Sequence, residues 1–506
     1  MKRYIILCII ALLSTTLYSQ KLIANSQQPI KVACIGNSVT YGYGHENPSL
    51  TSYPSQLAEM LGDDYEVGNF GKSGATLLRK GHRPYNEQEE FKKALEFAPD
   101  IAIIHLGLND TDPRNWKYYK REFISDYVAL IEDIERVNPD VEIYICRMSP
   151  IFHWHHRFLK GTRDWYWEIQ ETIENIAKNI AEVKIIDLQE VLYHRPDLMP
   201  DALHPNPEGA KLIAQRVYSA ITGDFGGLSL PDIYSDNMVI QHDKPFVVKG
   251  TADAGDEVTI NLVETSSLWR LNKQKIKTTT GDDGKWEVVF DAPKVDGKSY
   301  TLTIDTDSDD RIQFKNIVVG EVVLCSGNSM STDNRQRTTD FVADFNDIRL
   351  CYMDSDISSS WVKIEDIRPY VSTGETLYNI GAKISDSLQM PVGLIYMVVE
   401  DAPIESFIDR KTLEWHPILI DVLYEWRNAD NTKDCLHPYE PSYQHQLRIK
   451  PLESFQINSV LWFGDDYDYG DDYDLDPMKE SALIESWRKV WGEFFFKKIS
   501  INKDED

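Results

Sequence analysis

Basic residues are scarce in this sequence. Its 506 residues include 53 lysines and arginines against 81 aspartates and glutamates, which gives a formal net charge of −28 at pH 7. A protein that binds nucleic acid neutralises phosphates with a basic surface, whereas a chain of this charge repels polyanions. The composition therefore argues against DNA or RNA as a partner.

Long apolar runs are also missing. A membrane-spanning helix needs ~20 consecutive apolar residues, and no run in the sequence reaches that length. Residues 1–20 combine a basic start, an apolar run from Tyr4 to Leu13, and then small and polar residues, a pattern typical of a secretory signal peptide. We therefore expect an exported protein, periplasmic or secreted, without a membrane span. Nothing in the sequence predicts an oligomeric state.

Cysteines are few, and their number argues against a disulfide framework. Five of the six remain once a signal peptide containing Cys8 is removed. Cys34, Cys146 and Cys325 lie inside apolar strand-like runs, where a thiol behaves as a small buried hydrophobe. A pair between Cys325 and Cys351 stays open.

Residues 31–223 alternate strand-like and amphipathic helical segments. This alternation predicts a parallel sheet with helices on both faces, a three-layer flavodoxin-like α/β domain that covers residues 21–223. The expected strands are Val32–Ile35, Tyr65–Asn69, Ile101–Leu106, Val141–Cys146 and Val183–Leu188. The expected helices are Tyr53–Leu61, Glu87–Phe97, Tyr118–Val137, Trp165–Ala181 and Pro207–Ile221.

Polar loops follow the expected strands, where the crevice of an open α/β sheet collects ligands. In the first, Gly36-Asn37-Ser38, the serine sits at the carboxyl end of a strand and the glycine allows a sharp turn. The other loops are Asn69 to Thr76, Gly107 to Asp110 and Asp201 to Asn206. Each loop alone is better explained by ordinary turn, cap or solvated residues, so a functional interpretation depends on the combination.

In this order the four loops resemble the sequence blocks of the SGNH subgroup of GDSL-type esterases and lipases. The matching residues are Gly36-Asn37-Ser38, Gly71, Gly107-Leu108-Asn109-Asp110 and Asp201-x-x-His204, and they span the whole first domain. Many members of the family carry aspartate where this chain has Asn37, a change beside the nucleophile that leaves the chemistry intact. The resemblance implies an SGNH hydrolase fold and a Ser–His–Asp esterase.

The residue types fit that chemistry. A serine hydroxyl becomes a competent nucleophile when an imidazole accepts its proton, so we expect Ser38 to attack and His204 to act as the general base. Asp201, three residues earlier, is expected to orient the imidazole and to stabilise its charged form. The resemblance also implies an oxyanion hole made by the backbone N–H groups of Ser38 and Gly71 and by the side-chain amide of Asn109.

Aromatic residues are dense in the segments from Ile151 to Phe158 and from Trp165 to Trp167. Aromatic rings can stack on a sugar while their polar edges hydrogen-bond its hydroxyls. We therefore predict that Trp154 and His155 contact a glycan. Core packing is the alternative for the segment from Trp165 to Trp167, and a surface loop is the alternative for the histidines.

A metal site is not expected in this aromatic segment. His153, His155 and His156 have no carboxylate or cysteine at the spacing of a zinc site. A serine mechanism needs no metal, and we expect no cofactor.

Composition changes at the glycine-rich stretch from Gly223 to Gly227, where we expect a domain boundary. Beyond it, short alternating runs separated by Gly/Asp turns predict an antiparallel β-sandwich over residues 228–319. The expected strands include Phe246–Lys249, Val258–Leu262, Trp286–Phe290 and Tyr300–Ile304.

An apolar strand ends in Gly-Asn-Ser for a second time between Val319 and Ser329. Together with the segment from Leu230 to Gln241 and the sandwich, it resembles the sialate O-acetylesterase family, which places a β-sandwich before its own SGNH-like domain. The segments from Pro391 to Ile395 and from Pro403 to Ile408 extend the resemblance over most of residues 228–464. The resemblance implies a second α/β SGNH-like domain over residues 320–506 and an O-acetylated carbohydrate as substrate.

The functional blocks of this second domain are degenerate. The family's Gly-Gln-Ser-Asn is Gly327-Asn328-Ser329-Met330 here, and no Asp-x-x-His follows the last expected strand. The stretch from Asp434 to His437 has the spacing but precedes the Leu461–Phe463 strand, and the acidic tract 465–474 lacks the spacing of a calcium-binding EF-hand loop. We therefore expect Ser329 to be a relic in a truncated domain.

Taken together, the sequence predicts an exported serine esterase that removes O-acetyl groups from a carbohydrate through an acyl-Ser38 intermediate. Sialic acid and other acetylated glycans are both consistent with the resemblance. Two alternatives stay open, a lysophospholipase or thioesterase built on the same first domain and a carbohydrate-binding protein without catalytic activity. A long-chain substrate would require an extended apolar channel.

Overall fold

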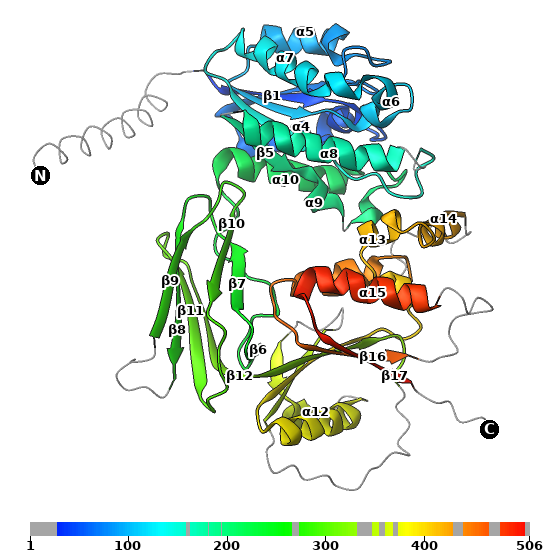
Figure 1. Ribbon diagram of the computed structural model, residues 1–506. Helices are drawn as coiled ribbons and strands as arrows, with labels where there is room; N and C mark the ends of the chain where they lie inside the picture. The colour runs from blue at the N-terminus through cyan, green and yellow to red at the C-terminus, as the bar shows by residue number, and fades with distance from the viewer. Residues whose placement is uncertain are drawn as a thin grey trace, which may run out of the picture. The chain divides into compact units, whose positions relative to one another are not determined.

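The computed structural model describes residues 28–157, 162–180, 182–193, 195–265, 273–330, 347–353, 360–367, 373–428, 439–464 and 476–500. The chain divides into two compact units, Met1–Tyr218 and Ser219–Asp506 (Figure 1). The expected signal peptide, the stretch from Asp434 to His437 and the acidic tract 465–474 lie outside the described residues.

The first unit is built on a parallel five-stranded sheet with the strand order β2-β1-β3-β4-β5. This order is that of the flavodoxin-like doubly wound fold, in which ligands bind beyond the carboxyl ends of the strands. The prediction of a parallel α/β sheet in this half of the chain is confirmed. The strands are β1 (Ile30–Gly36), β2 (Tyr65–Gly71), β3 (Ile101–His105), β4 (Glu142–Arg147) and β5 (Val183–Asp187).

Amphipathic helices supply the crossovers and cover the sheet. On α7 (Phe123–Glu135) the buried residues recur every three or four positions, so one stripe of the helix faces the core. The central strand β3 is buried along its whole length, as expected for a strand that is covered on both faces. The other long helices are α4 (Tyr53–Leu61), α5 (Glu89–Phe97), α8 (Thr162–Asn179) and α10 (Pro207–Thr222).

Most strands in the first part of the second unit pair antiparallel. β7 (Phe246–Thr251) pairs with β10 (Lys285–Phe290), and a separate ladder runs in the order β9-β8-β11-β12. Every second residue of β10 is buried, which is the pattern of a sheet with one face on a core. The ladder strands are β8 (Glu257–Glu264), β9 (Lys273–Thr279), β11 (Ser299–Thr306) and β12 (Arg311–Gly327), and β6 (Val239–Gln241) pairs with β12.

Strand β12 belongs to two kinds of sheet. Its first half pairs antiparallel with β11, and residues 321–327 pair in parallel with β15 (Val392–Val398) and β16 (Ser459–Gly464). Its burial changes accordingly, from alternating to continuous beyond residue 316, because the parallel part is covered on both faces. The predicted boundary between residues 319 and 320 thus falls inside one continuous strand.

The parallel part of this sheet is completed by β13 (Ile348–Tyr352), β17 (Phe495–Ser500) and the antiparallel edge strand β14 (Trp361–Lys363). Within the second unit, α12 (Gly374–Leu388) and α15 (Asp476–Trp491) lie on opposite faces of the sheet (Figure 1). The extra sheets expected after the first domain are therefore present.

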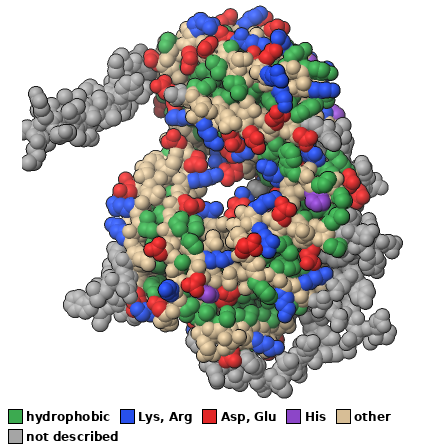
Figure 2. Space-filling view, viewed as in Figure 1, with side chains coloured by type: hydrophobic (Ala, Val, Ile, Leu, Met, Phe, Trp, Pro, Cys, Tyr) green, Lys and Arg blue, Asp and Glu red, His purple; other side chains and the backbone are tan. Residues whose placement is uncertain are grey.

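Acidic side chains are scattered rather than gathered over the face drawn in Figure 2. Among the described residues, no helix combines the length and apolarity that crossing a membrane requires. Cys34, Cys146, Cys325 and Cys351 are buried free thiols, so the pairing left open between Cys325 and Cys351 is not formed. Burial raises the pKa of both of these thiols to about 12.

The last residue of β2, Gly71, packs directly against the short helix α2 (Ser38–Tyr41). A Cβ at this position would lie 2.2 Å from the Tyr41 nitrogen and 2.7 Å from the Thr40 carbonyl carbon. Because these contacts are backbone atoms, we expect Gly71→Ala to displace α2 and to destabilise the fold by about 1–3 kcal/mol, measured as a lower melting temperature.

Gly68→Ala on the same strand is the control. Its Cβ would meet only side-chain atoms of the Phe70 ring, which can shift more readily than backbone, so we expect the smaller loss. Equal melting temperatures for the two variants would contradict the close packing of Gly71 on α2.

Candidate active site

Ser38 begins helix α2 immediately beyond the end of β1. The preceding residue, Asn37, caps the helix by accepting the Val39 N–H at 2.9 Å, and its side-chain amide donates to the His105 carbonyl at 3.1 Å. An aspartate here could cap the helix but could not donate to His105. Asn37 therefore ties the serine turn to the end of β3 and holds Ser38 at the carboxyl edge of the sheet.

His204 lies between Ser38 and Asp201. Its Nε2 is 2.8 Å from Ser38 Oγ and its Nδ1 is 2.6 Å from Asp201 Oδ2. With the Nδ1 proton donated to the carboxylate, Nε2 is left to accept the serine O–H. The structure thus brings together the three residues predicted as a triad, although 166 positions separate Ser38 from His204.

The carboxylate of Asp201 is held by three donors. Besides the imidazole, the backbone N–H groups of Leu203 and His204 donate to its Oδ1 at 3.1 and 2.7 Å. Burial acts to raise the pKa of Asp201, but the bonds from the His204 side chain and backbone outweigh it and lower that pKa to about 2. Asp201 is therefore ionised at neutral pH, as a residue must be if it is to stabilise an imidazolium.

Two residues that sequence reasoning missed hold the histidine loop. The Tyr43 ring packs on the His204 ring with centroids 4.6 Å apart. His45 Nε2 lies 2.9 Å from the Pro205 carbonyl oxygen, while its Nδ1 bonds to Thr51. The sequence signals these two residues only by their position, five and seven residues after Ser38. Their contacts with His204 and Pro205 form only when that distant loop folds back onto them.

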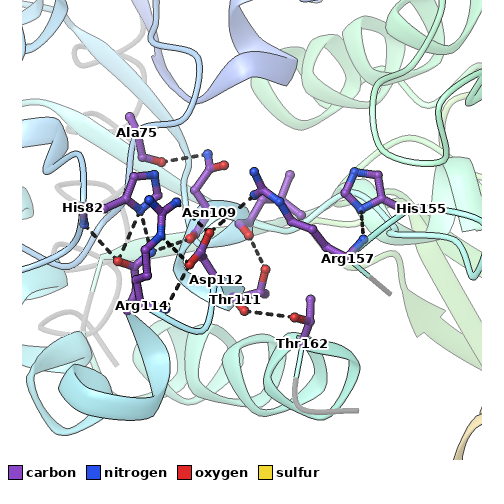
Figure 3. Close-up of polar contacts among 11 residues, drawn as sticks. Ala75, His82, Asn109, Thr111, Asp112, Arg114, His155, Arg157 and Thr162 are labelled. Atoms are coloured by element: carbon purple, nitrogen blue, oxygen red, sulfur yellow. Dashed lines mark hydrogen bonds and ion pairs between the residues drawn. The ribbon is translucent and has the colours of Figure 1, made fainter. Parts of the chain in front are cut away.

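Asn109, the predicted side-chain donor, lies in the loop after β3 and is 8% exposed. One N–H of its amide donates to the Ala75 carbonyl at 2.9 Å, so the second N–H remains for another acceptor. Its backbone carbonyl accepts the Asn115 side-chain amide at 2.7 Å. The Ala75 contact, drawn in Figure 3, orients the side-chain amide, whereas the Asn115 contact holds the backbone of Asn109.

The Gly71 N–H, also predicted as an oxyanion donor, is engaged within its own loop. It donates to Asn69 Oδ1 at 3.0 Å. Three residues further on, Gly74 adopts a left-handed conformation with φ of 78°, and within the described part of the chain its N–H donates to no group. Gly74 therefore offers an N–H that no described group of this loop engages.

Asp110 holds the chain that follows Gly74 by accepting two of its backbone N–H groups. It is fully buried, and its two oxygens accept the N–H groups of Leu77 and Leu78 at 2.9 and 2.8 Å. Burial raises the pKa of this carboxyl to about 7, while the two N–H donors act in the opposite direction. Asp110 thereby fixes the segment that carries Ala75, the acceptor that orients Asn109.

The predicted glycan-contact residues lie close to the histidine loop. The Phe152 N–H donates to the Ala202 carbonyl at 2.9 Å, which joins this segment to the Asp201 turn. Trp154 stacks on Phe152 with centroids 4.8 Å apart. His155 is buried, and burial followed by the positive charges of His156 and Arg157 lowers its pKa to about 4.

Helix α8 carries the other aromatic run, and there core packing is favoured. Tyr166 is buried, and its hydroxyl donates to the Met148 carbonyl at 3.2 Å. The Trp167 ring meets the edges of Tyr166 and Tyr193. In the part of the chain that the structure describes, no group of three or more His, Cys, Asp or Glu side chains could hold a metal ion.

A serine hydrogen-bonded to a histidine that an aspartate orients, at the carboxyl edge of a doubly wound sheet, is the arrangement of a serine hydrolase. Residues 34–212 match the family model described as "GDSL-like Lipase/Acylhydrolase family". This part of the chain is therefore a GDSL/SGNH esterase domain, and the resemblance of its four loops to that family is confirmed.

Two curated proteins are similar to parts of the chain. An acetylxylan esterase of Xylanibacter ruminicola is 36% identical over 221 residues, which are 39% of this chain and 44% of that protein. A sialate O-acetylesterase of Rattus norvegicus is 22% identical over 307 residues, 51% of this chain and 56% of that protein. The chain thus spans about half the length of the curated relatives that it matches.

Among solved structures, a carbohydrate acetylesterase from Xanthomonas citri aligns with 54% of this chain and 60% of its own chain. The alignment has 20% sequence identity and a TM-score of 0.40.

The bracing role of Asp110 can be tested by Asp110→Asn. An amide offers one oxygen where two backbone N–H groups need acceptors, so one N–H is left unsatisfied at a cost of about 1–3 kcal/mol. We expect a lower melting temperature and a lower kcat/KM for p-nitrophenyl acetate, because the support of Asn109 loosens.

Asp126→Asn is the matched control. Asp126 accepts one backbone N–H, that of Arg79, through a single oxygen at 2.8 Å, and an amide oxygen can replace it. The bracing role is wrong if the two variants lose stability and activity equally.

Proposed function

We propose that this chain is a serine esterase that removes O-acetyl groups from a carbohydrate through an acetyl-Ser38 intermediate. The observation that carries the proposal is the position of His204, within hydrogen-bond distance of both Ser38 and Asp201. The roles of nucleophile, general base and orienting carboxylate follow from that geometry.

In the first half of the reaction, Ser38 Oγ attacks the acetyl carbonyl carbon while its proton passes to His204 Nε2. The C–O bond to the sugar then breaks, and the sugar oxygen takes the proton from His204. In the second half, water loses a proton to His204 and attacks acetyl-Ser38. Acetate leaves, and Ser38 regains its proton from the imidazole.

The negative charge that develops on the carbonyl oxygen needs donors in place before the reaction. We assign them to the Ser38 N–H, the free N–H of the Asn109 amide and a backbone N–H of the loop from Gly71 to Gly74. Within that loop we favour Gly74, because the Gly71 N–H is occupied by Asn69. Asn37 and Asp110 support this hole without touching the substrate.

The choice of an acetylated carbohydrate is supported by the relatives, whose names specify acetylxylan and O-acetylated sialate. Trp154 and His155 are proposed to contact the sugar, since they lie on the segment joined to the Asp201 turn. We also propose that the chain is exported, on the basis of the basic start and apolar run in residues 1–20.

For the second unit, we propose a β-sandwich over residues 228–319 and a degenerate SGNH-like region over residues 320–506. The turn that carries Ser329 differs from the turn that carries Ser38 in the engagement of its backbone donors. The N–H groups of Asn328 and Ser329 both donate to the Phe463 carbonyl, at 2.9 and 3.4 Å, so neither is available to an oxyanion. This supports the assignment of Ser329 as a relic.

The proposal is tested with Ser38→Ala, and with Ser329→Ala as the control from the same Gly-Asn-Ser setting. We expect Ser38→Ala to lower kcat for acetyl esters by about 10⁴-fold or more while the protein stays folded, and Ser329→Ala to match the wild type. If Ser38→Ala keeps its activity, Ser38 is not the nucleophile and the proposed site is wrong. If the wild type itself cleaves no acetyl ester, a carbohydrate-binding role becomes the better account.

The same assay separates acetyl from long-chain chemistry. We expect higher kcat/KM for p-nitrophenyl acetate and for an acetylated sugar than for long-chain p-nitrophenyl esters. A preference for long chains would replace the proposed activity with that of a lysophospholipase or thioesterase.

A further inference from the structure

Two arginines converge on one carboxylate beside Asn109. The N–H of Asp112 donates to the Asn109 carbonyl at 3.3 Å. Its carboxylate accepts Nε and Nη2 of Arg114, both at 2.9 Å, together with the Arg114 backbone N–H. Those hydrogen bonds lower the pKa of Asp112 to about 2. Arg114 alone therefore neutralises Asp112.

Arg157 is a second, surplus cation at this cluster. Its Nη1 lies 4.0 Å from Asp112 Oδ2, which is too long for a hydrogen bond. Its side chain is 38% exposed, and no hydrogen bond from its guanidinium to any described residue is formed. Asp112, Arg114 and Arg157 together carry one net positive charge, and among the described residues none occupies the Arg157 fork by a hydrogen bond.

Arg157 also lies between the segment that carries His155 and the loop that carries Asn109 and Asp112. Figure 3 shows its side chain reaching from the segment that carries His155 toward Asp112 and Asn109. Its backbone N–H donates to His155 Nδ1 at 3.3 Å, and the same segment is joined to the Asp201 turn by the hydrogen bond from the Phe152 N–H to the Ala202 carbonyl. If the acetyl group of a substrate lies between Asn109 and His204, the sugar that carries it would have its other substituents near this segment.

An exposed guanidinium binds carboxylates well, because its planar fork matches the two carboxylate oxygens. In a chain of net charge −28, an anionic substrate needs such a local cation to overcome the general repulsion. We propose that Arg157 binds the carboxylate of an acidic sugar, so that the preferred substrate is an O-acetylated uronic or sialic acid unit rather than a neutral sugar. This inference rests on the esterase function proposed above.

The test compares an O-acetylated uronic acid, and an O-acetylated sialic acid, each with its own methyl ester. Each pair differs only in the charge of the carboxyl group, so the ratio of kcat/KM for acid over methyl ester reports recognition of that charge. We expect the wild type to favour the acid by about 10- to 100-fold for at least one of the pairs, and the ratio to fall as salt concentration rises.

Arg157→Gln is expected to bring that ratio close to one, and Arg157→Lys to retain part of it, because a lysine keeps the charge and loses the fork. Because the ratio is taken within one variant, any general loss of activity cancels. Arg136→Gln is the control, since this exposed arginine pairs with Asp133 at the end of α7, at the opposite edge of the sheet. It should keep the wild-type ratio.

The outcomes separate the two proposals. Equal hydrolysis of acid and methyl ester in both pairs by the wild type, or an unchanged ratio in Arg157→Gln, overturns the role of Arg157 and leaves the esterase intact. If no acetate is released from any acetylated sugar, acidic or neutral, while simple esters are cleaved, the carbohydrate esterase proposal fails and this inference fails with it.

Discussion

The hydrogen bond between His204 and Ser38 is the interaction on which the rest of the first unit depends. It joins residues 166 positions apart, so the sheet must deliver both loops to the same edge. Asn37 ties the serine turn to β3, and His45 and Phe152 hold the two sides of the histidine loop. Each of these contacts is a single hydrogen bond that helps to position a catalytic group.

The proposed hydrogen-bond donors to the negatively charged carbonyl oxygen are also held in place by other residues. Asn109 is fixed by Ala75, and the segment that carries Ala75 is held in turn because Asp110 accepts the N–H groups of Leu77 and Leu78. Donors that are already oriented need not reorganise when charge develops, which is the source of their catalytic value. In the second unit the equivalent N–H groups turn to the Phe463 carbonyl, so a similar sequence does not produce a similar site.

Much of this could be predicted from the sequence. The five parallel strands follow from apolar runs, and the triad of Ser38, Asp201 and His204 follows from the resemblance of four loops, taken together, to the SGNH family. What escaped prediction depends on contacts between distant segments. The Gly71 N–H was predicted as an oxyanion donor, but the Asn69 side chain accepts it. Tyr43 and His45 contact the histidine loop only because the chain folds back there with His204. Strand β12 runs through a predicted domain boundary because this one strand belongs to two sheets.

The central claim is that Ser38 becomes acylated during turnover. The most direct measurement is to quench the enzyme in the presence of an acetyl ester and to map the modified peptides by mass spectrometry. The account predicts one acetyl group on the peptide containing Ser38, and its absence from that peptide in His204→Ala. An acetyl group on Ser329, or steady turnover with no acyl-enzyme on the Ser38 peptide under any quench condition, would contradict it.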